Sequence, residues 1–134
     1  MAEMDPKLEI ELNIREAKEM LEVADATIVQ GFYSTAINRA YYAVFYAATA
    51  VLAMSEQSRK KHSAVLSEFR KQFIKTGIFE TSLSDYYGQL MDDRHAADYD
   101  LMNDISESEA QQNVAQAHIF VDVIEAWLKK EQWI

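Results

Sequence analysis

The hydrophobic positions along the chain predict a protein built from five helices. Near both ends of the chain, apolar residues recur at alternating intervals of four and three residues. This spacing places them on one side of a helix, as expected for a helix that packs lengthwise in a bundle. The first series is Ile10, Ile14, Ala17, Leu21, Ala24 and Ile28, and the last is Ala110, Val114, Ala117, Val121, Ile124 and Leu128.

Capping residues give the approximate limits of these two helices. Asp5 followed by Pro6 is typical of a helix start, with Pro6 at the first helical position. Gly31 suits the C-terminal end of the same helix. Ser106, followed three residues later by Glu109, forms an S-x-x-E capping box and predicts the start of the last helix.

The second predicted helix, at residues 34–54, is apolar on most of its faces. A helix of this kind lies at the centre of a bundle, where several other helices cover it. A polar loop at 55–61 separates it from a third predicted helix at 62–76, which stops at Gly77.

The fourth helix is predicted at residues 82–97, with Ser82 at its start and Asp85 as a capping partner. Short loops between consecutive helices imply antiparallel neighbours. The predicted fold class is therefore all-α, an up-and-down bundle of four to five helices that forms one domain over residues 1–134. The expected core includes Ile14, Leu21, Tyr41, Phe45, Val51, Phe69, Phe73, Leu90, Val121 and Ile124.

The composition agrees with long helices and short loops, because the chain has only three glycines and one proline. The absence of cysteine excludes disulfides and thiolate metal sites. The N-terminus does not resemble a signal peptide, and the longest apolar stretch, at 40–54, is too short for a membrane span. We therefore expect a cytoplasmic protein that does not insert into a membrane.

The charge is distributed unevenly. A net charge of −9 argues against a general polyanion binder, so no DNA partner is expected. Residues 59–75, however, contain six basic side chains and one acidic side chain. This segment is either a local surface for a phosphate group or an acidic partner, or simply a solvated helix face.

Four short motifs, in the same order and spacing, resemble the HEPN family. Residues 38–45 read NRAYYAVF and resemble the RAYYAxF helix of HEPN-domain proteins. Residues 61–63 (KHS) and 73–77 (FIKTG) match the two ends of the following helix in that family. Residues 94–99 (RHAADY) resemble its R-x-x-A-D-Y element. Each motif alone is weak, but four in order make the resemblance fairly specific, above all to small stand-alone HEPN proteins.

The resemblance implies a helical bundle that forms a homodimer and is encoded beside a minimal nucleotidyltransferase. Active HEPN proteins are metal-independent ribonucleases, many of them toxins, so neither a metal nor a cofactor is expected. Their motif consists of an arginine, a polar residue, several further positions and then a histidine. Arg94 and His95 match its start, whereas Asp98 and Tyr99 stand near the position of the closing histidine. Tyrosines near this motif are modified in related systems, so Tyr99 is a candidate acceptor of a nucleotidyl group.

RNA cleavage without a metal needs a base, an acid and a cation beside the phosphate. Arg94 suits the third role because its planar guanidinium can bind two phosphate oxygens. His95 is the better acid–base candidate, since imidazole exchanges protons near neutral pH, but one residue from Arg94 it lies about 100° around the helix and need not face the same cleft. Asp98 serves as a base only if it is desolvated, and Tyr99 would act as a proton donor. These four residues form the predicted catalytic set.

The predicted RNA- or nucleotide-binding residues are Arg39, Tyr42, Lys61 and His62. Arg39 is a charge beside the most apolar helix, so it needs a partner or a cleft to face, and Asp98 or another acid of the fourth helix is a candidate partner. We expect Arg39 and Arg94 to approach one cleft together with Asp98 or Tyr99.

Each of these residues also has a structural interpretation. Arg94 and Asp98 are four residues apart and would form an ordinary ion pair on one helix. Tyr41 and Tyr42 are candidates for core packing, and His118 lies beside the last apolar series, where a structural role is expected. Two hypotheses therefore remain: a ribonuclease-like or nucleotide-binding domain, and a non-catalytic interaction module that has lost the nuclease histidine.

Overall fold

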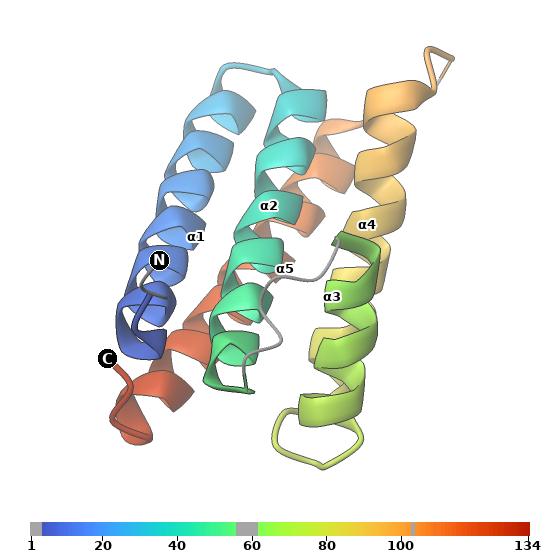
Figure 1. Cartoon of the computed structure of the whole chain (residues 1–134). Coiled ribbons are helices and arrows are strands. Elements are labelled where there is room, and N and C mark those ends of the chain that lie inside the picture. The colour runs from blue at the N-terminus through green and yellow to red at the C-terminus, as the bar shows by residue number, and fades with distance from the viewer. Residues whose placement is uncertain (1–3, 56–61, 103) are drawn as a thin grey trace.

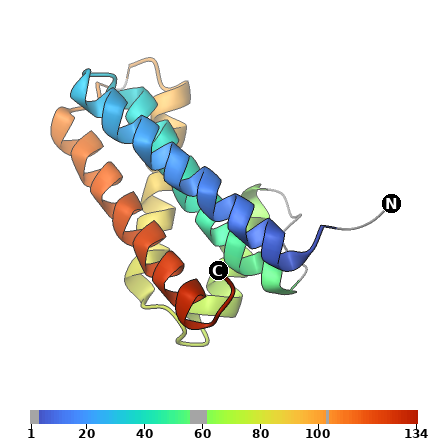
Figure 2. The ribbon, with the colours of Figure 1, turned by 90° about the vertical axis from the view of Figure 1, so that its left-hand side faces the viewer.

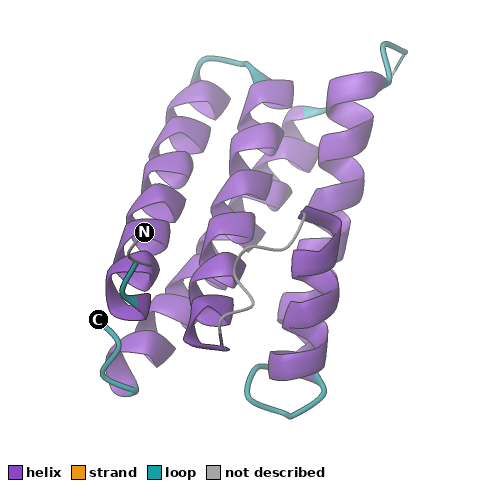
Figure 3. Ribbon diagram, in the orientation of Figure 1, coloured by secondary structure: helices purple, strands orange, loops and turns teal. Residues whose placement is uncertain are grey.

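The computed structural model describes residues 4–55, 62–102 and 104–134, and this part of the chain is all-α, with no strand (Figures 1 and 3). Neighbouring helices run up and down, as the short loops predicted. The helices are α1 (Pro6–Val29), α2 (Tyr33–Leu52), α3 (His62–Phe69), α4 (Thr81–Tyr99) and α5 (Glu107–Lys130). None of these described helices combines the length and the apolar character needed to cross a membrane.

Helix α2 is the central element, as its sequence predicted. Of its 20 residues, 13 are buried, and in Figure 1 the helix lies between α1 and α4 with α5 behind it. Its many alanines permit the other helices to approach closely. The apolar surface of α2 is thus covered within a single chain, so this surface gives no support to a dimer.

The ten residues expected in the core are all buried. An aromatic cluster fills the space between α3, α4 and α5. The ring of Phe69 lies 5.3 to 6.2 Å, between centroids, from its aromatic neighbours. These neighbours are Phe73, Phe79, Tyr87 and Phe120.

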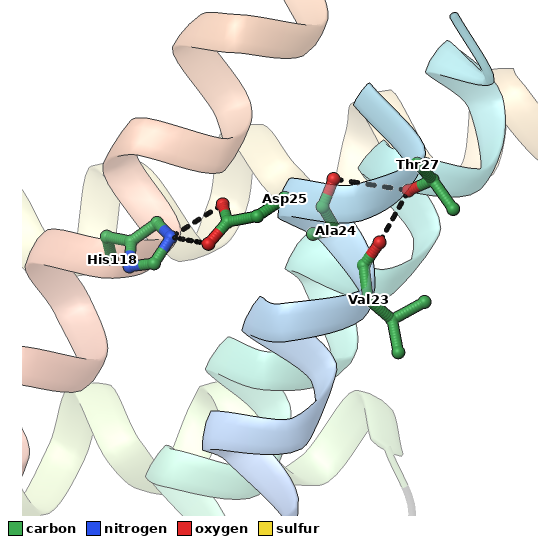
Figure 4. A network of polar contacts seen from close by, with 5 residues as sticks. All are labelled: Val23, Ala24, Asp25, Thr27 and His118. Carbon is green, nitrogen blue, oxygen red and sulfur yellow. Dashed lines mark hydrogen bonds and ion pairs between the residues drawn. The ribbon is translucent and has the colours of Figure 1, made fainter. Parts of the chain in front are cut away.

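Helices α1 and α5 lie side by side in Figure 2 and are joined by polar contacts. His118 of α5 pairs with Asp25 of α1 at 2.8 Å (Figure 4). In the same view, the Thr27 hydroxyl donates to the carbonyl of Val23 at 2.7 Å, so it satisfies its hydrogen bond within its own helix. The contact of His118 fits the structural role expected for it.

The predicted caps of the first and last helices are confirmed. The Asp5 carboxylate accepts from the backbone N–H of Lys7 at 3.3 Å, and Gly31 adopts a positive φ of 85° just after α1. The Ser106 hydroxyl accepts from the backbone N–H of Glu109 at 3.1 Å.

The start of α4 differs from the prediction. The helix begins at Thr81, after an extended Glu80, and no side chain caps it. The carbonyl of Glu80 instead accepts from the N–H of Leu83 at 3.1 Å, which places Ser82 inside the first turn. At the other end α4 continues two residues beyond position 97, so Tyr99 belongs to the helix.

The third predicted helix, at 62–76, is not uniform. Helix α3 passes into a π-helical segment, η2 (Arg70–Ile74), in which the N–H of Lys75 bonds to the carbonyl of Arg70 at 2.9 Å. This bond spans five residues instead of four, so the turn is wider than in an α-helix. Gly77, with a φ of 79°, follows the end of the segment as predicted.

Candidate functional site

The residues of the two most family-like motifs meet where α2 packs against α4. Asn38 of α2 donates from Nδ2 to the Oδ2 atom of Asp98 at 3.0 Å. Arg94 of α4 donates from Nη2 to the hydroxyl of Tyr42 at 3.2 Å. We call the set Asn38, Arg39, Tyr42, Arg94 and Asp98 the Arg94 cluster.

Arg94 is held from several directions. Its Nε atom lies 3.1 Å from Asp98 Oδ2, and only 20% of its side chain is exposed. Its Cζ atom lies 5.1 Å from the ring centroid of Tyr41 and 5.5 Å from that of Tyr42. An arginine at these distances from two aromatic rings gains cation–π attraction in addition to its ion pair. The guanidinium is therefore fixed in one orientation.

Two buried polar atoms in this cluster lack a hydrogen bond within the described part of the chain. They are Arg94 Nε, whose contact with Asp98 is an ion pair without hydrogen-bond alignment, and Asn38 Oδ1. Buried polar atoms are almost always satisfied in native proteins, so each exception needs an explanation. Both atoms belong to side chains that contact the same carboxylate, so one bound polar group or water near Asp98 would account for both.

Arg39 is the second cation of the cluster. Its Cζ lies 5.9 Å from the centroid of Tyr42, and its Nη1 contacts the sulfur of Met20 at 3.7 Å. The structure therefore brings Arg39 and Arg94 to one ring, whereas a cleft that they share with Asp98 or Tyr99 stays a prediction. No described carboxylate pairs with Arg39, so the expectation that Asp98 or another acid of α4 is its partner is wrong. Asp98 pairs with Arg94 because the two are one turn apart on a single helix, where an ion pair forms at low entropic cost.

The two tyrosines of the NRAYY motif have different roles. Tyr41 is 1% exposed and belongs to the core. Burial raises the pKa of Tyr41, an effect that the nearby Arg94 partly offsets, so this phenol is neutral at physiological pH. Tyr42 is half-buried and contacts both arginines of the cluster. Both tyrosines thus fit the structural interpretation, Tyr41 within the core and Tyr42 as a contact between α2 and α4 that packs against the core.

The four residues predicted as catalytic separate into two pairs. Arg94 and Asp98 lie between α2 and α4, whereas His95 and Tyr99 face solvent with ring centroids 5.0 Å apart. The reason is helical geometry, since consecutive residues point about 100° apart around the axis. His95 is therefore not placed beside Arg94 as a partner in proton transfer.

The remaining predicted binding residues cannot be placed in the site. Lys61 lies outside the described residues, and so does the side chain of His62, whose backbone begins α3. One residue of the cluster was missed. Asn38 stands four residues before Tyr42, on the narrow polar strip of an otherwise apolar helix, and this spacing could have identified it.

A family model described as HEPN domain matches residues 10–127, which is most of the chain. The chain belongs to the HEPN family. The resemblance predicted from four motifs is thus confirmed, and the bundle described above is consistent with the HEPN fold.

Individual relatives support this assignment over nearly the whole length. A protein of Methanocaldococcus jannaschii named "Putative toxin MJ0142" is 36% identical over 94% of this HEPN chain and 86% of its own length. A second protein of that organism, "Putative toxin MJ0605", is 33% identical over 94% of this chain and 93% of its own length. A "UPF0332 protein" of Thermotoga maritima is 34% identical over 83% of this chain and 84% of its own length.

Proposed function

We propose that this HEPN chain is a toxin-type protein that binds a phosphate of single-stranded RNA at the Arg94 cluster and cleaves the RNA slowly without a metal. The observation that carries the proposal is that the guanidinium groups of Arg39 and Arg94 both lie at the ring of Tyr42, with the carboxylate of Asp98 beside Arg94. A phosphate oxygen is a suitable acceptor for guanidinium donors. Two relatives named as toxins support the biological class.

The charge of the cluster suits an anion. Arg39 and Arg94 contribute two positive charges against the one negative charge of Asp98, on a protein whose net charge is −9. The ring of Tyr42 contacts both guanidinium groups, and its hydroxyl accepts a hydrogen bond from Arg94, so this residue holds the two cations near each other. A phosphate would thus find two positive charges side by side.

Slow cleavage follows from the groups that are present. Arg94 can stabilise the negative charge that develops on the phosphate in the transition state. Asp98 is engaged by both Arg94 and Asn38, so it is poorly placed to act as a base. His95 faces solvent and not Arg94. The loss of an aligned general base costs about 10²–10⁴-fold in rate.

The test is to incubate purified protein with mixed RNA in the presence of a chelator. We expect slow cleavage by the wild type, none by Arg94→Ala, and unchanged cleavage by Arg15→Ala. Arg15 is an exposed arginine of α1 and serves as a matched control for loss of one positive charge. Equal cleavage by wild type and Arg94→Ala would show that the activity comes from another site or a contaminant.

A second candidate function, a non-catalytic module that pairs with a minimal nucleotidyltransferase, is favoured by the position of Tyr99. This phenol is 66% exposed, so a partner enzyme can reach it. In the proposed reaction the phenol oxygen attacks the α-phosphate of a nucleoside triphosphate, and pyrophosphate leaves. Mass spectrometry after incubation with the partner should show one added nucleotidyl group on the wild type and none on Tyr99→Phe.

We also propose a homodimer, which the family resemblance implies. The described apolar residues that remain strongly exposed include Val29, Phe32, Leu101 and Met102, at the two connections drawn at the top of Figure 1. This end of the bundle is the surface we expect a second copy to cover. Light scattering at micromolar concentration should give twice the mass of one chain, and a monomer would contradict this proposal.

A further inference from the structure

A second arginine is held against α4 on the side of α3. Arg70 is the first residue of the π-helical segment, and its Nε donates to the hydroxyl of Ser84 at 2.7 Å. Ser84 is only 9% exposed, so its hydroxyl is a fixed acceptor. The guanidinium then continues over Gly88, one helical turn further along α4.

Gly88 has no conformational reason to be glycine. It lies inside α4 without a positive φ, where glycine is about 1 kcal/mol less favourable than alanine. A Cβ atom added at this position would stand 2.9 Å from Arg70 Nη2, which is too close. The guanidinium therefore occupies the space that a side chain at position 88 would need.

The two Nη groups of the Arg70 guanidinium remain available to bind a ligand. Arg70 is an exposed residue, and its hydrogen bond to Ser84 uses only Nε. No carboxylate of the described residues pairs with it, and neither Nη atom has a hydrogen-bond partner there. The neighbouring Lys71 and Lys75 are also exposed, and they belong to the basic segment identified in the sequence. An oriented guanidinium with two free Nη groups is suited to bind a phosphate.

Arg70 lies over the same side of α4 as two of the predicted catalytic residues, His95 and Tyr99. Gly88 and His95 are seven residues apart on α4, so they lie on the same side of the helix and about 10 Å apart along its axis. At roughly 3.4 Å per stacked nucleotide, this distance corresponds to about three nucleotides. Tyr99, which contacts His95, extends the same side of α4 by one more turn.

We propose that Arg70 is a second phosphate-binding residue for the RNA that Arg94 holds, and that the strand follows α4 from the Arg94 cluster past His95 to Arg70. This inference rests on the proposed RNA binding, and it adds the path that the RNA strand follows over the protein. Gly88 is then the residue that sets the orientation of Arg70, and the basic segment around Lys71 and Lys75 is the surface along which the strand leaves.

The test compares the affinity of the wild type and four variants for a labelled single-stranded RNA. Arg70→Gln keeps a side chain that can bond to Ser84 but removes the charge. We expect binding about tenfold weaker, as for one lost charge-assisted contact. The slope of log affinity against log salt should become shallower by about 0.7. Arg94→Gln should weaken binding further, and Arg15→Gln should bind like the wild type.

Gly88→Ala separates ligand binding from a purely structural role of Arg70. It keeps every charge and favours the helix, but it displaces the guanidinium, so we expect unchanged or greater stability together with weaker RNA binding. If Arg94→Gln loses affinity while Arg70→Gln and Gly88→Ala bind like the wild type, the inference about Arg70 is wrong and the proposed function stands. If the wild type itself binds no RNA, both are wrong.

Discussion

Arg94 donates a hydrogen bond to the hydroxyl of Tyr42 at 3.2 Å and so joins the two helices that carry the most family-like motifs. The same guanidinium lies over the ring of Tyr42, which also attracts Arg39. A bound RNA phosphate would therefore meet side chains whose orientation is already set before it arrives. Such preorganisation lowers the entropic cost of binding.

The hydrogen bond to Tyr42 can be tested without changing the ring. In Tyr42→Phe, the aromatic contact with both arginines remains, but Arg94 loses one acceptor. We expect RNA binding to weaken a few-fold and the free energy of unfolding to fall by about 0.5–1.5 kcal/mol. Titration with RNA and urea denaturation measure the two effects. Tyr46→Phe, a half-buried position one turn further along α2, is the control and should bind like the wild type.

Asp98 opposes the binding of an anion in our account. Asp98→Asn removes the negative charge but keeps an oxygen that can accept from Asn38. We expect RNA binding to become several-fold tighter because Arg94 is released from its ion pair. Weaker binding by Asp98→Asn would contradict this account of the cluster. Cleavage that falls while binding tightens would show that Asp98 acts as the base.

The hydroxyl of Tyr87 is predicted to destabilise the fold. Tyr87 is 0% exposed, and its hydroxyl has no hydrogen-bond partner in the described part of the chain. An unsatisfied buried hydroxyl costs about 1–3 kcal/mol, and Phe fills nearly the same volume. We expect Tyr87→Phe to raise the free energy of unfolding at pH 8 by about 1 kcal/mol in urea denaturation. A loss of stability would mean that the hydroxyl is satisfied by a group or water inside the protein.

The same tyrosine gives the protein a dependence on alkaline pH. Burial raises the pKa of Tyr87 well above its ordinary value of 10.0. Above pH 10 the unfolded chain loses this proton while the folded chain keeps it, so stability is full below pH 10 and falls as the pH rises further. Unfolding measured between pH 8 and pH 11 should show a smaller loss for Tyr87→Phe than for the wild type. An identical loss would show that Tyr87 is not the group responsible.

The start of α5 depends on one hydroxyl. Ser106→Ala removes the acceptor for the N–H of Glu109, and the loss of such a cap costs about 1 kcal/mol. Thermal unfolding should show the decrease. Ser108→Ala, at an exposed position in the first turn of the same helix, should leave the stability unchanged.

The sequence predicted those features that depend on local spacing. The apolar series beginning at Ile10 and Ala110 predicted α1 and α5, because the residues on one face of a helix recur at a fixed interval. Ser106 and Glu109 gave the start of α5, because a cap and its partner are neighbours in the chain. The family motifs singled out Arg39 and Arg94, which the fold brings to the ring of Tyr42.

The features that sequence reasoning missed depend on contacts between distant segments. The reason for a glycine at position 88 can be recognised only from its contact with Arg70, which belongs to another helical segment. Asn38 enters the site only through its bond to Asp98, 60 residues further along the chain. Helical geometry already indicated that His95 and Arg94 point in different directions, but which of the two faces α2 could be learned only from the packing of α4.

If RNA binds at the Arg94 cluster, a phosphate contacts the guanidinium of Arg94, and NMR can observe this group. In a ¹⁵N-labelled protein, the Nε–H resonance of each arginine can be followed as short single-stranded RNA is added. We predict that the Arg94 resonance shifts, because a phosphate at its guanidinium changes its pairing with Asp98, while the resonance of Arg15 stays in place. If RNA binds and other resonances move while that of Arg94 remains unchanged, Arg94 does not hold the phosphate and the proposed site is wrong.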